Sequence, residues 1–164
     1  MADSYRISGA GRFSHAKAAR FTFDGQAYTG IEGDTLASAL LANGVHLVGR
    51  SFKYHRPRGI VGSWVEEPNA IVDVTLDGRT TPNLRATTEL LRAGMAVRSV
   101  NARPTAEGDR LGLLDRLSPF LPAGFYYKTF LWPDWHRFEP SIRAMAGLGR
   151  VDPGGPVRGR SRRP

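Results

Sequence analysis

The chain has 164 residues, of which 41% are hydrophobic and none is cysteine, and it carries a formal net charge of +8. This length fits one domain, or one small domain with an appendage. The lack of cysteine excludes disulfides and thiolate-based catalysis or metal sites, and because neither a secretory signal nor an apolar run of roughly 20 residues is present, we expect a cytoplasmic protein without membrane contact.

The first predicted elements are a β-hairpin and a short helix. Residues 20–30 place apolar side chains on both sides of the Asp-Gly pair at 24–25, which is a strong two-residue hairpin signal. Residues 35–43 follow as a helix, with Asp34 as its N-cap and Gly44 as the C′ residue that ends it. The apolar stripe of this helix must pack on a sheet.

Further strands are predicted after a long loop. A strand over residues 70–76 ends at the Asp-Gly pair at 77–78, and residues 86–91 and 95–100 are predicted to form a second hairpin. The order strand, strand, helix, loop and further strands is that of a β-grasp, although many α+β folds begin in this way. We therefore predict an α+β fold with a β-grasp domain over residues 18–103.

Several long motifs in the chain resemble one enzyme family. They are Phe-Thr-Phe-Asp-Gly at 21–25, Gly-Asp-Thr-Leu-Ala-Ser-Ala-Leu-Leu-Ala-Asn-Gly at 33–44, Arg-Ser-Phe-Lys-Tyr-His-Arg-Pro-Arg-Gly at 50–59, Glu-Glu-Pro-Asn-Ala at 66–70 and Leu-Ser-Pro-Phe-Leu-Pro-Ala-Gly-Phe-Tyr-Tyr-Lys-Thr-Phe at 117–130. Across about residues 18–150 the chain is similar to the N-terminal region of the alpha subunit of heterotetrameric sarcosine oxidase. Motifs of this length are far more specific than a GxGxxG signature.

The resemblance implies a 2Fe-2S ferredoxin-like β-grasp that has lost its cluster. It implies a complex that oxidatively demethylates sarcosine with FAD, FMN and NAD held outside this chain, and that passes the one-carbon unit to tetrahydrofolate; the remaining subunits or domains would be its partners. Relatives with a cluster carry a Cys-x4-Cys-x2-Cys loop, and by that spacing the ligand positions fall on Gly62, Glu67 and Ala70, with a fourth near Leu84. One carboxylate cannot replace four thiolates, so we expect no metal, no cofactor and no catalytic residue in this chain.

The chain also departs from the family it resembles. A full alpha subunit is several times longer, and its Gly-x-Gly-x-x-Gly motif should begin shortly after the position where this chain stops. Here residues 147–150 lead instead into a segment rich in Pro, Gly and Arg. We expect either a genuine small subunit or a truncated, frameshifted or split gene product, and the sequence leaves this choice open.

A basic segment, residues 50–58, is the best candidate site within the chain. Arg50, Lys53, Arg56 and Arg58 lie within nine residues, and this stiff loop could bind a flavin or nucleotide phosphate or an acidic partner surface. An equally good alternative is a loop whose charges are solvated or paired within the chain.

The residues beside this segment suggest further hypotheses. His55 is not expected to bind metal or act as a general base, because no second histidine or suitably spaced carboxylate pair accompanies it. Glu66 and Glu67 are adjacent and so point to opposite faces of an extended chain, which argues against an acid/base pair. We predict instead that one of them pairs with the arginine loop and holds the cysteine-free loop in shape, while Trp64 fills part of the vacated volume.

The C-terminal third is predicted to be an irregular, partly helical extension over residues 104–149. Leucines from residue 111 to 117 suggest a short helix, and the following stretch to residue 138 is rich in aromatic residues and interrupted by prolines. An irregular aromatic strip fits a protein-docking surface. A meander packed on the domain's own sheet is the alternative, and we expect a mixture of the two.

Both chain ends are predicted to be poorly ordered, over residues 1–17 and 150–164. The C-terminal tail holds five arginines and one aspartate, whereas the other 149 residues carry 18 basic and 14 acidic groups, so half of the net charge belongs to the tail. A basic tail can bind nucleic acid without sequence preference. A solvated, disordered end is the commoner situation for this composition.

We predict a non-catalytic structural or assembly domain, or subunit, of a flavin-dependent amine oxidoreductase similar to sarcosine oxidase. An orphaned fragment without activity and a basic module that binds nucleic acid non-specifically are the alternatives. The second alternative is weakened by the mild charge of the body of the chain. A stand-alone enzyme is not expected, because the chain shows no nucleophile-base pair, metal cluster or dinucleotide loop.

Overall fold

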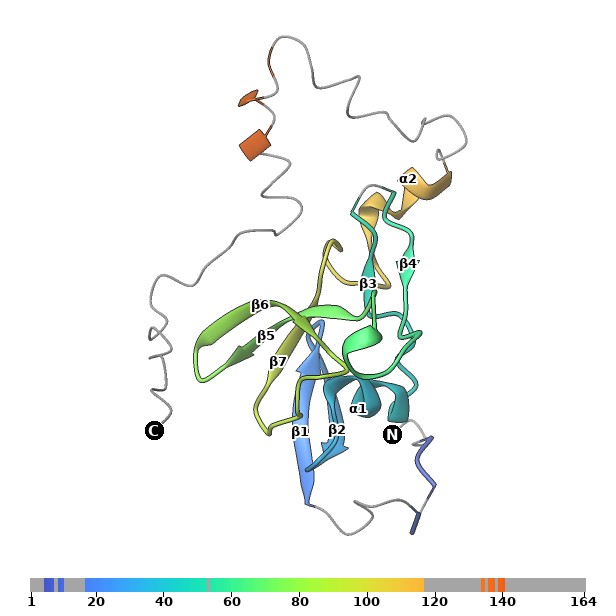
Figure 1. The fold of residues 1–164 in the computed structure, drawn as a ribbon, viewed down its shortest axis with the longest axis vertical. Coiled ribbons are helices and arrows are strands. Elements are labelled where there is room, and N and C mark those ends of the chain that lie inside the picture. The colour runs from blue at the N-terminus through green and yellow to red at the C-terminus, as the bar shows by residue number, and fades with distance from the viewer. Residues whose placement is uncertain are drawn as a thin grey trace, which may run out of the picture.

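A computed structural model describes residues 5–7, 9–10, 17–52, 54–116, 134, 136–137 and 139–140. Its helices and strands, in chain order, are β1 (Ala18–Phe23), β2 (Gln26–Ile31), α1 (Leu36–Ala42), β3 (Gly49–Arg50), β4 (Pro57–Arg58), the 3-10 turn η1 (Trp64–Glu66), β5 (Ile71–Leu76), β6 (Arg79–Arg85), β7 (Ala96–Ser99), the 3-10 turn η2 (Arg110–Gly112) and α2 (Leu113–Arg116). Figure 1 shows α1 beside β1 and β2, with the short strands β3 and β4 extending away from the main sheet.

Within the described residues, five strands form one mixed sheet in the order β2-β1-β7-β5-β6. β1 pairs antiparallel with β2 across the predicted Asp-Gly turn at 24–25, and it pairs parallel with β7. β5 pairs antiparallel with both β6 and β7. A first hairpin, a helix and a last strand parallel to the first make up a β-grasp, so the predicted α+β fold class is confirmed.

The hydrophobic core lies between this sheet and α1. β1 buries Ala19, Phe21 and Phe23 in the two-residue alternation of a strand with one covered face. α1 buries four side chains against them: Leu36, Ala37, Ala39 and Leu40. β5 and β7 complete the cluster with valines, including Val72 and Val97. The amphipathic helix therefore packs on the sheet, as its apolar stripe requires.

Side chains fix both ends of α1. Thr35 is the N-cap: its hydroxyl accepts a hydrogen bond from Ser38 N at 3.2 Å, and Ser38 Oγ accepts one from Thr35 N at 3.0 Å, which makes a capping box. The prediction of Asp34 as N-cap is therefore wrong by one residue. Asn43 is the C-cap, and Gly44, with a φ of +75°, is the left-handed C′ residue that was predicted.

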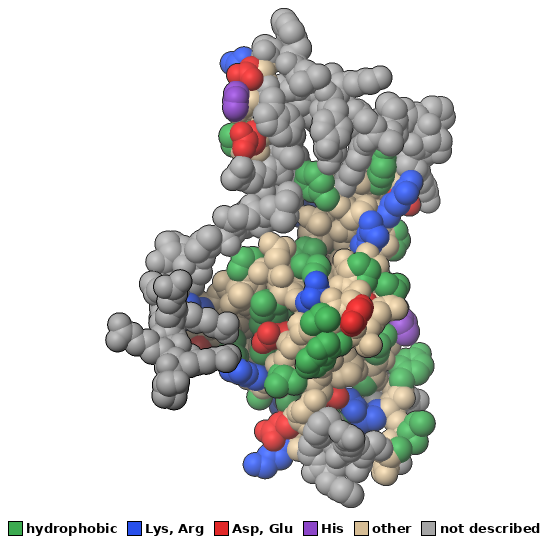
Figure 2. Space-filling model, viewed as in Figure 1, with side chains coloured by type: hydrophobic (Ala, Val, Ile, Leu, Met, Phe, Trp, Pro, Cys, Tyr) green, Lys and Arg blue, Asp and Glu red, His purple; other side chains and the backbone are tan. Residues whose placement is uncertain are grey.

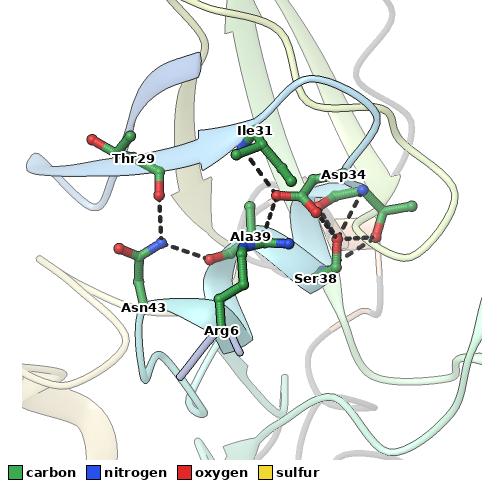
Figure 3. Close-up of polar contacts among 8 residues, drawn as sticks. Arg6, Thr29, Ile31, Asp34, Ser38, Ala39 and Asn43 are labelled. Atoms are coloured by element: carbon green, nitrogen blue, oxygen red, sulfur yellow. Dashed lines mark hydrogen bonds and ion pairs between the residues drawn. The ribbon is translucent and has the colours of Figure 1, made fainter. Parts of the chain in front are cut away.

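Asp34 instead joins the N-terminal residues to the helix (Figure 3). It is buried, and its carboxylate accepts hydrogen bonds from Ile31 N and Ser38 Oγ, each at 3.1 Å, and from the Arg6 guanidinium at 2.5 Å. The preceding residue, Tyr5, donates its backbone N–H to the carbonyl of the last α1 residue at 2.9 Å. Tyr5 thus contacts α1 directly, and Arg6 contacts the residue before its N-cap.

The second predicted hairpin is wrong. The Asp-Gly turn at 77–78 joins β5 to β6, a strand that was not predicted, and residues 86–91 form turns and one isolated bridge. β6 escaped prediction because it is polar and contains Pro82, and its pairing with β5 includes a register shift. As an edge strand it tolerates both features. β7 falls within the predicted strand at 95–100.

The described part of the predicted extension packs back on the domain. Ala106 N donates a hydrogen bond to the Asp24 carboxylate in the β1–β2 turn, and Ala106 O accepts one from Arg50 Nε, both at 2.8 Å. Most of the predicted aromatic strip and the whole tail at 150–164 lie outside the described residues. In the part of the chain that the structure describes, no helix is long and apolar enough to cross a membrane.

Substitution of two neighbouring leucines tests which face of α1 packs on the sheet. Leu40 is fully buried, whereas Leu41 is 37% exposed. We expect Leu40→Ala to lower the free energy of unfolding by about 2–5 kcal/mol because it leaves a cavity in the core, and Leu41→Ala to lower it by about 1 kcal/mol or less. Urea unfolding followed by circular dichroism measures both, and equal losses would contradict the observed orientation of the helix.

Candidate functional site

The cluster loop, defined here as residues 59–70, connects β4 to β5 and includes η1. Three of the four predicted ligand positions, Gly62, Glu67 and Ala70, lie in this loop. Leu84 lies on β6, where it packs against the hydrophobic core. The contacts of the cluster loop therefore show which group lies at the predicted ligand positions.

The Glu67 carboxylate is bound by the cluster loop itself. Glu67 is fully buried, which is rare for a glutamate without partners. Its Oε2 accepts hydrogen bonds from Val61 N at 2.7 Å and Gly62 N at 2.5 Å. Its Oε1 accepts hydrogen bonds from Asn69 N at 2.7 Å and Ala70 N at 3.1 Å. The two oxygens therefore join the two arms of the loop.

These contacts fix the charge of Glu67. Burial raises the pKa of its carboxyl group, but the four backbone hydrogen bonds lower it, and the net result is a pKa below the ordinary value for glutamate. The side chain is therefore an ionised carboxylate at neutral pH. Its charge is stabilised by backbone N–H dipoles.

The residues at the ligand positions do not fit a 2Fe-2S cluster. Such a cluster requires four thiolate ligands, or histidines in place of two of them, and the chain contains no cysteine. The side chains of Gly62 and Ala70 offer no ligand atom, and the carboxylate of Glu67 already has four donors. Among the described residues, no group of three or more His, Cys, Asp or Glu could hold a metal ion.

Two predictions for this loop need correction. Glu67 holds the loop in shape as expected, but through backbone N–H groups. Within the described residues, no ion pair joins Glu66 or Glu67 to the basic segment at 50–58. Trp64 does not fill a vacated volume, because it is 62% exposed. Val61 and Val65 of the same loop are also exposed, at 70% and 53%. Figure 2 shows that apolar side chains lie at the surface of the face drawn in Figure 1.

The structure brings Thr87, rather than Leu84, to the cluster loop. Thr87 is buried, and its Oγ1 donates a hydrogen bond to the Trp64 carbonyl at 2.6 Å. Arg85 supports the same loop, because its Nε donates to the backbone carbonyl of Glu67 at 3.0 Å. Sequence reasoning missed both contacts because β6, which delivers these residues, was not predicted.

The described cations of the basic segment bind atoms of the chain itself. Arg50 Nη1 donates to the His55 carbonyl at 3.0 Å, in addition to its contact with residue 106. Arg56 Nε lies 2.9 Å from Asp115 Oδ1, and its guanidinium lies 5.0 Å from the centre of the Tyr54 ring. A further contact, at 2.9 Å, joins Arg58 Nη1 to the side-chain carbonyl of residue 69. These contacts favour the internally paired alternative, while Lys53 lies outside the described residues.

A histidine-aspartate pair fastens the basic segment to the residues after β7. His55 Nδ1 lies 2.7 Å from Asp109 Oδ2, and the Asp109 side chain is completely buried. Asp109 Oδ1 also accepts a hydrogen bond from Arg103 N at 3.0 Å. The two partners are 54 positions apart in sequence, so no local spacing could have revealed this pair.

Comparisons with known proteins show which family the chain resembles. Over residues 16–102 the chain matches the family described as 2Fe-2S iron-sulfur cluster binding domain. It is 55% identical over 151 residues to the sarcosine oxidase subunit alpha of Rhizobium meliloti (strain 1021), which covers 90% of this chain and 15% of that protein. The sarcosine oxidase subunit alpha of Corynebacterium sp. (strain U-96) is 44% identical over 78 residues, or 45% of this chain and 8% of that protein.

A solved structure is also similar in part. The crystal structure of L-proline dehydrogenase from P. horikoshii is 26% identical, with a TM-score of 0.40 over 52% of this chain and 16% of that chain. The chain thus spans at most 16% of the length of these three relatives. The sequence identities confirm the resemblance that the motifs predicted.

Acid should remove the contribution of Glu67 to stability. Because its pKa is lower in the fold, the carboxylate stabilises the fold above the unfolded-state pKa of about 4.3, and this contribution is lost as the pH falls through the folded-state pKa. We expect Glu67→Gln to lower the free energy of unfolding by about 2–4 kcal/mol at pH 7, since the amide leaves two N–H groups without an acceptor. The difference between the two chains should shrink below about pH 4.

Urea unfolding at both pH values measures this difference. Glu66→Gln is the matched control, because its side chain is exposed in the same loop and should cost less than about 0.5 kcal/mol at either pH. A loss for Glu67→Gln that is the same at pH 3.5 and pH 7 would contradict the role of the ionised form.

Proposed function

This chain belongs to the 2Fe-2S iron-sulfur cluster binding domain family, and we propose that it serves as a cluster-free, non-catalytic assembly domain or subunit of a flavin-dependent amine oxidoreductase similar to sarcosine oxidase. The observation that carries this proposal is the 55% identity to a sarcosine oxidase alpha subunit. That identity extends over 151 residues, beyond the family match at 16–102, so the likeness includes sequence outside the β-grasp domain.

The chemistry of such a complex would occur on other domains or subunits. FAD, FMN and NAD, the cofactors that the resemblance implies, would carry the electrons from a secondary amine. The cysteine-free loop cannot pass electrons through an iron-sulfur centre, and Glu67 occupies the interior of that loop. We therefore assign this chain a structural part in the complex.

The basic segment has a limited part in this proposal. Arg50 and Arg58 are committed to contacts within the chain, and we propose that they support the loop. The ion pair between Arg56 and Asp115 is more open, with side chains 53% and 40% exposed. Arg56 and Lys53 are thus the residues of this segment that we propose for contact with a cofactor phosphate or an acidic partner.

Purification of the tagged full chain from its source cells tests the proposal. We expect larger subunits to co-purify, to be identified by mass spectrometry as parts of a flavoprotein, and to give absorption bands at roughly 370 and 450 nm. The eluate should oxidise sarcosine or a similar secondary amine.

The same chain produced alone in an unrelated host is the control. It should be folded, colourless and without oxidase activity, because the flavins belong to its partners. Oxidase activity or bound flavin in the chain alone would overturn the non-catalytic assignment. Purification from source cells without any flavoprotein would overturn the assignment to an oxidoreductase complex.

A further inference from the structure

The four N–H groups that bind Glu67 form an anion site inside the cluster loop. We propose that this loop has been retained as an anion-binding loop whose ligand is now the chain's own carboxylate, and that it binds a small free carboxylate when the Glu67 side chain is removed. This inference rests on the contacts within the loop and is independent of the proposed function.

Two of the four donors come from the predicted ligand positions, and the other two come from their neighbours. Of the three predicted positions in the loop, Gly62 and Ala70 donate their backbone N–H groups to the carboxylate carried by the third, Glu67. Val61 and Asn69, each next to one of these positions, supply the other two donors. The carboxylate thus lies among the positions that the resemblance assigns to cluster ligands.

Both an iron-sulfur cluster and a carboxylate are negatively charged groups that backbone N–H groups can stabilise. A bound iron-sulfur cluster with thiolate ligands accepts hydrogen bonds at its sulfur atoms, and a carboxylate accepts stronger, charge-assisted ones. A buried charge is costly unless several such bonds replace its hydration. Four bonds of 2.5–3.1 Å to Glu67 supply this replacement.

Contacts outside the Glu67 side chain hold the same loop. Thr87 Oγ1 binds the Trp64 carbonyl, and Arg85 Nε binds the Glu67 backbone carbonyl. A further link runs from the Arg58 guanidinium to the side chain of Asn69. Because none of these contacts uses the Glu67 carboxylate, they would keep the four donors near one another after its removal.

The size of the missing group predicts which ligand fits. Glu67→Ala removes a CH2–COO⁻ group, which acetate matches apart from one hydrogen atom. Acetate should therefore occupy the vacated space and accept the same four N–H bonds, whereas chloride can neutralise the site but cannot join its two arms. Butyrate carries two further CH2 groups and so exceeds the volume that the substitution vacates.

Thermal unfolding of the full chain at pH 7 tests this inference. We expect Glu67→Ala to lower Tm by about 10 °C or more in sodium chloride. Sodium acetate at equal ionic strength should restore part of the loss, with the saturable dependence of ligand binding to a folded state. The unmodified chain, whose site is already filled, should show no such gain, and butyrate should act like chloride on both chains.

Glu66→Ala is the matched control, since it removes the same group from an exposed neighbour. It should change Tm little and should not respond to acetate. An acetate effect of equal size on all three chains, or none on Glu67→Ala beyond that of chloride, would overturn the inference.

Glu67→Gln decides the question if Glu67→Ala does not fold in chloride or in acetate. The amide keeps the shape of the side chain but not its charge, so we expect a lower Tm and faster hydrogen exchange at the backbone N–H groups of residues 69 and 70. A Tm within about 2 °C of the unmodified chain, with unchanged exchange rates, would overturn the anion-site inference.

Discussion

The buried Glu67 carboxylate sets the path of the chain into β5, next to the edge of the sheet. By holding Asn69 N and Ala70 N, it fixes the last residues before β5 begins. The Ala70 carbonyl then accepts a hydrogen bond from Ala86 N at 2.8 Å, where β6 has just ended. The bonds to Glu67 therefore hold the end of the hairpin at which β5 begins and β6 ends.

Polar side chains from distant parts of the sequence hold the remaining loops on this frame. Asp24, in the turn of the first hairpin, accepts hydrogen bonds from Ser99 N, Ser99 Oγ and Ala106 N, all at 2.8 Å. Asp109 binds His55 in the same part of the structure. Carboxylates that bind backbone N–H groups thus recur in this chain, and those of Asp24, Glu67 and Asp109 each hold loop residues in place.

The sequence predicted what local rules govern and missed what depends on distant partners. The Asp-Gly turn at 24–25, the apolar stripe of α1 and the Gly44 stop are encoded within a few residues. β6 is encoded by its pairing with β5, because its own residues are polar and include Pro82. The role of Glu67 could be predicted only in part. Its position within the loop followed from the spacing, but its donors are backbone N–H groups, which every residue except proline has, so the sequence does not identify them.

Because the group that fills the cluster loop is a side chain of the same chain, the loop needs no added ligand to take its shape. Where a metal centre is a structural part of a fold, its binding free energy contributes to folding, and the protein waits for its metal. In this loop the Glu67 carboxylate, a group within the chain, joins the two arms instead. Oxidants also find no thiolate to attack here. The described loop therefore reaches its shape with groups that the chain itself supplies.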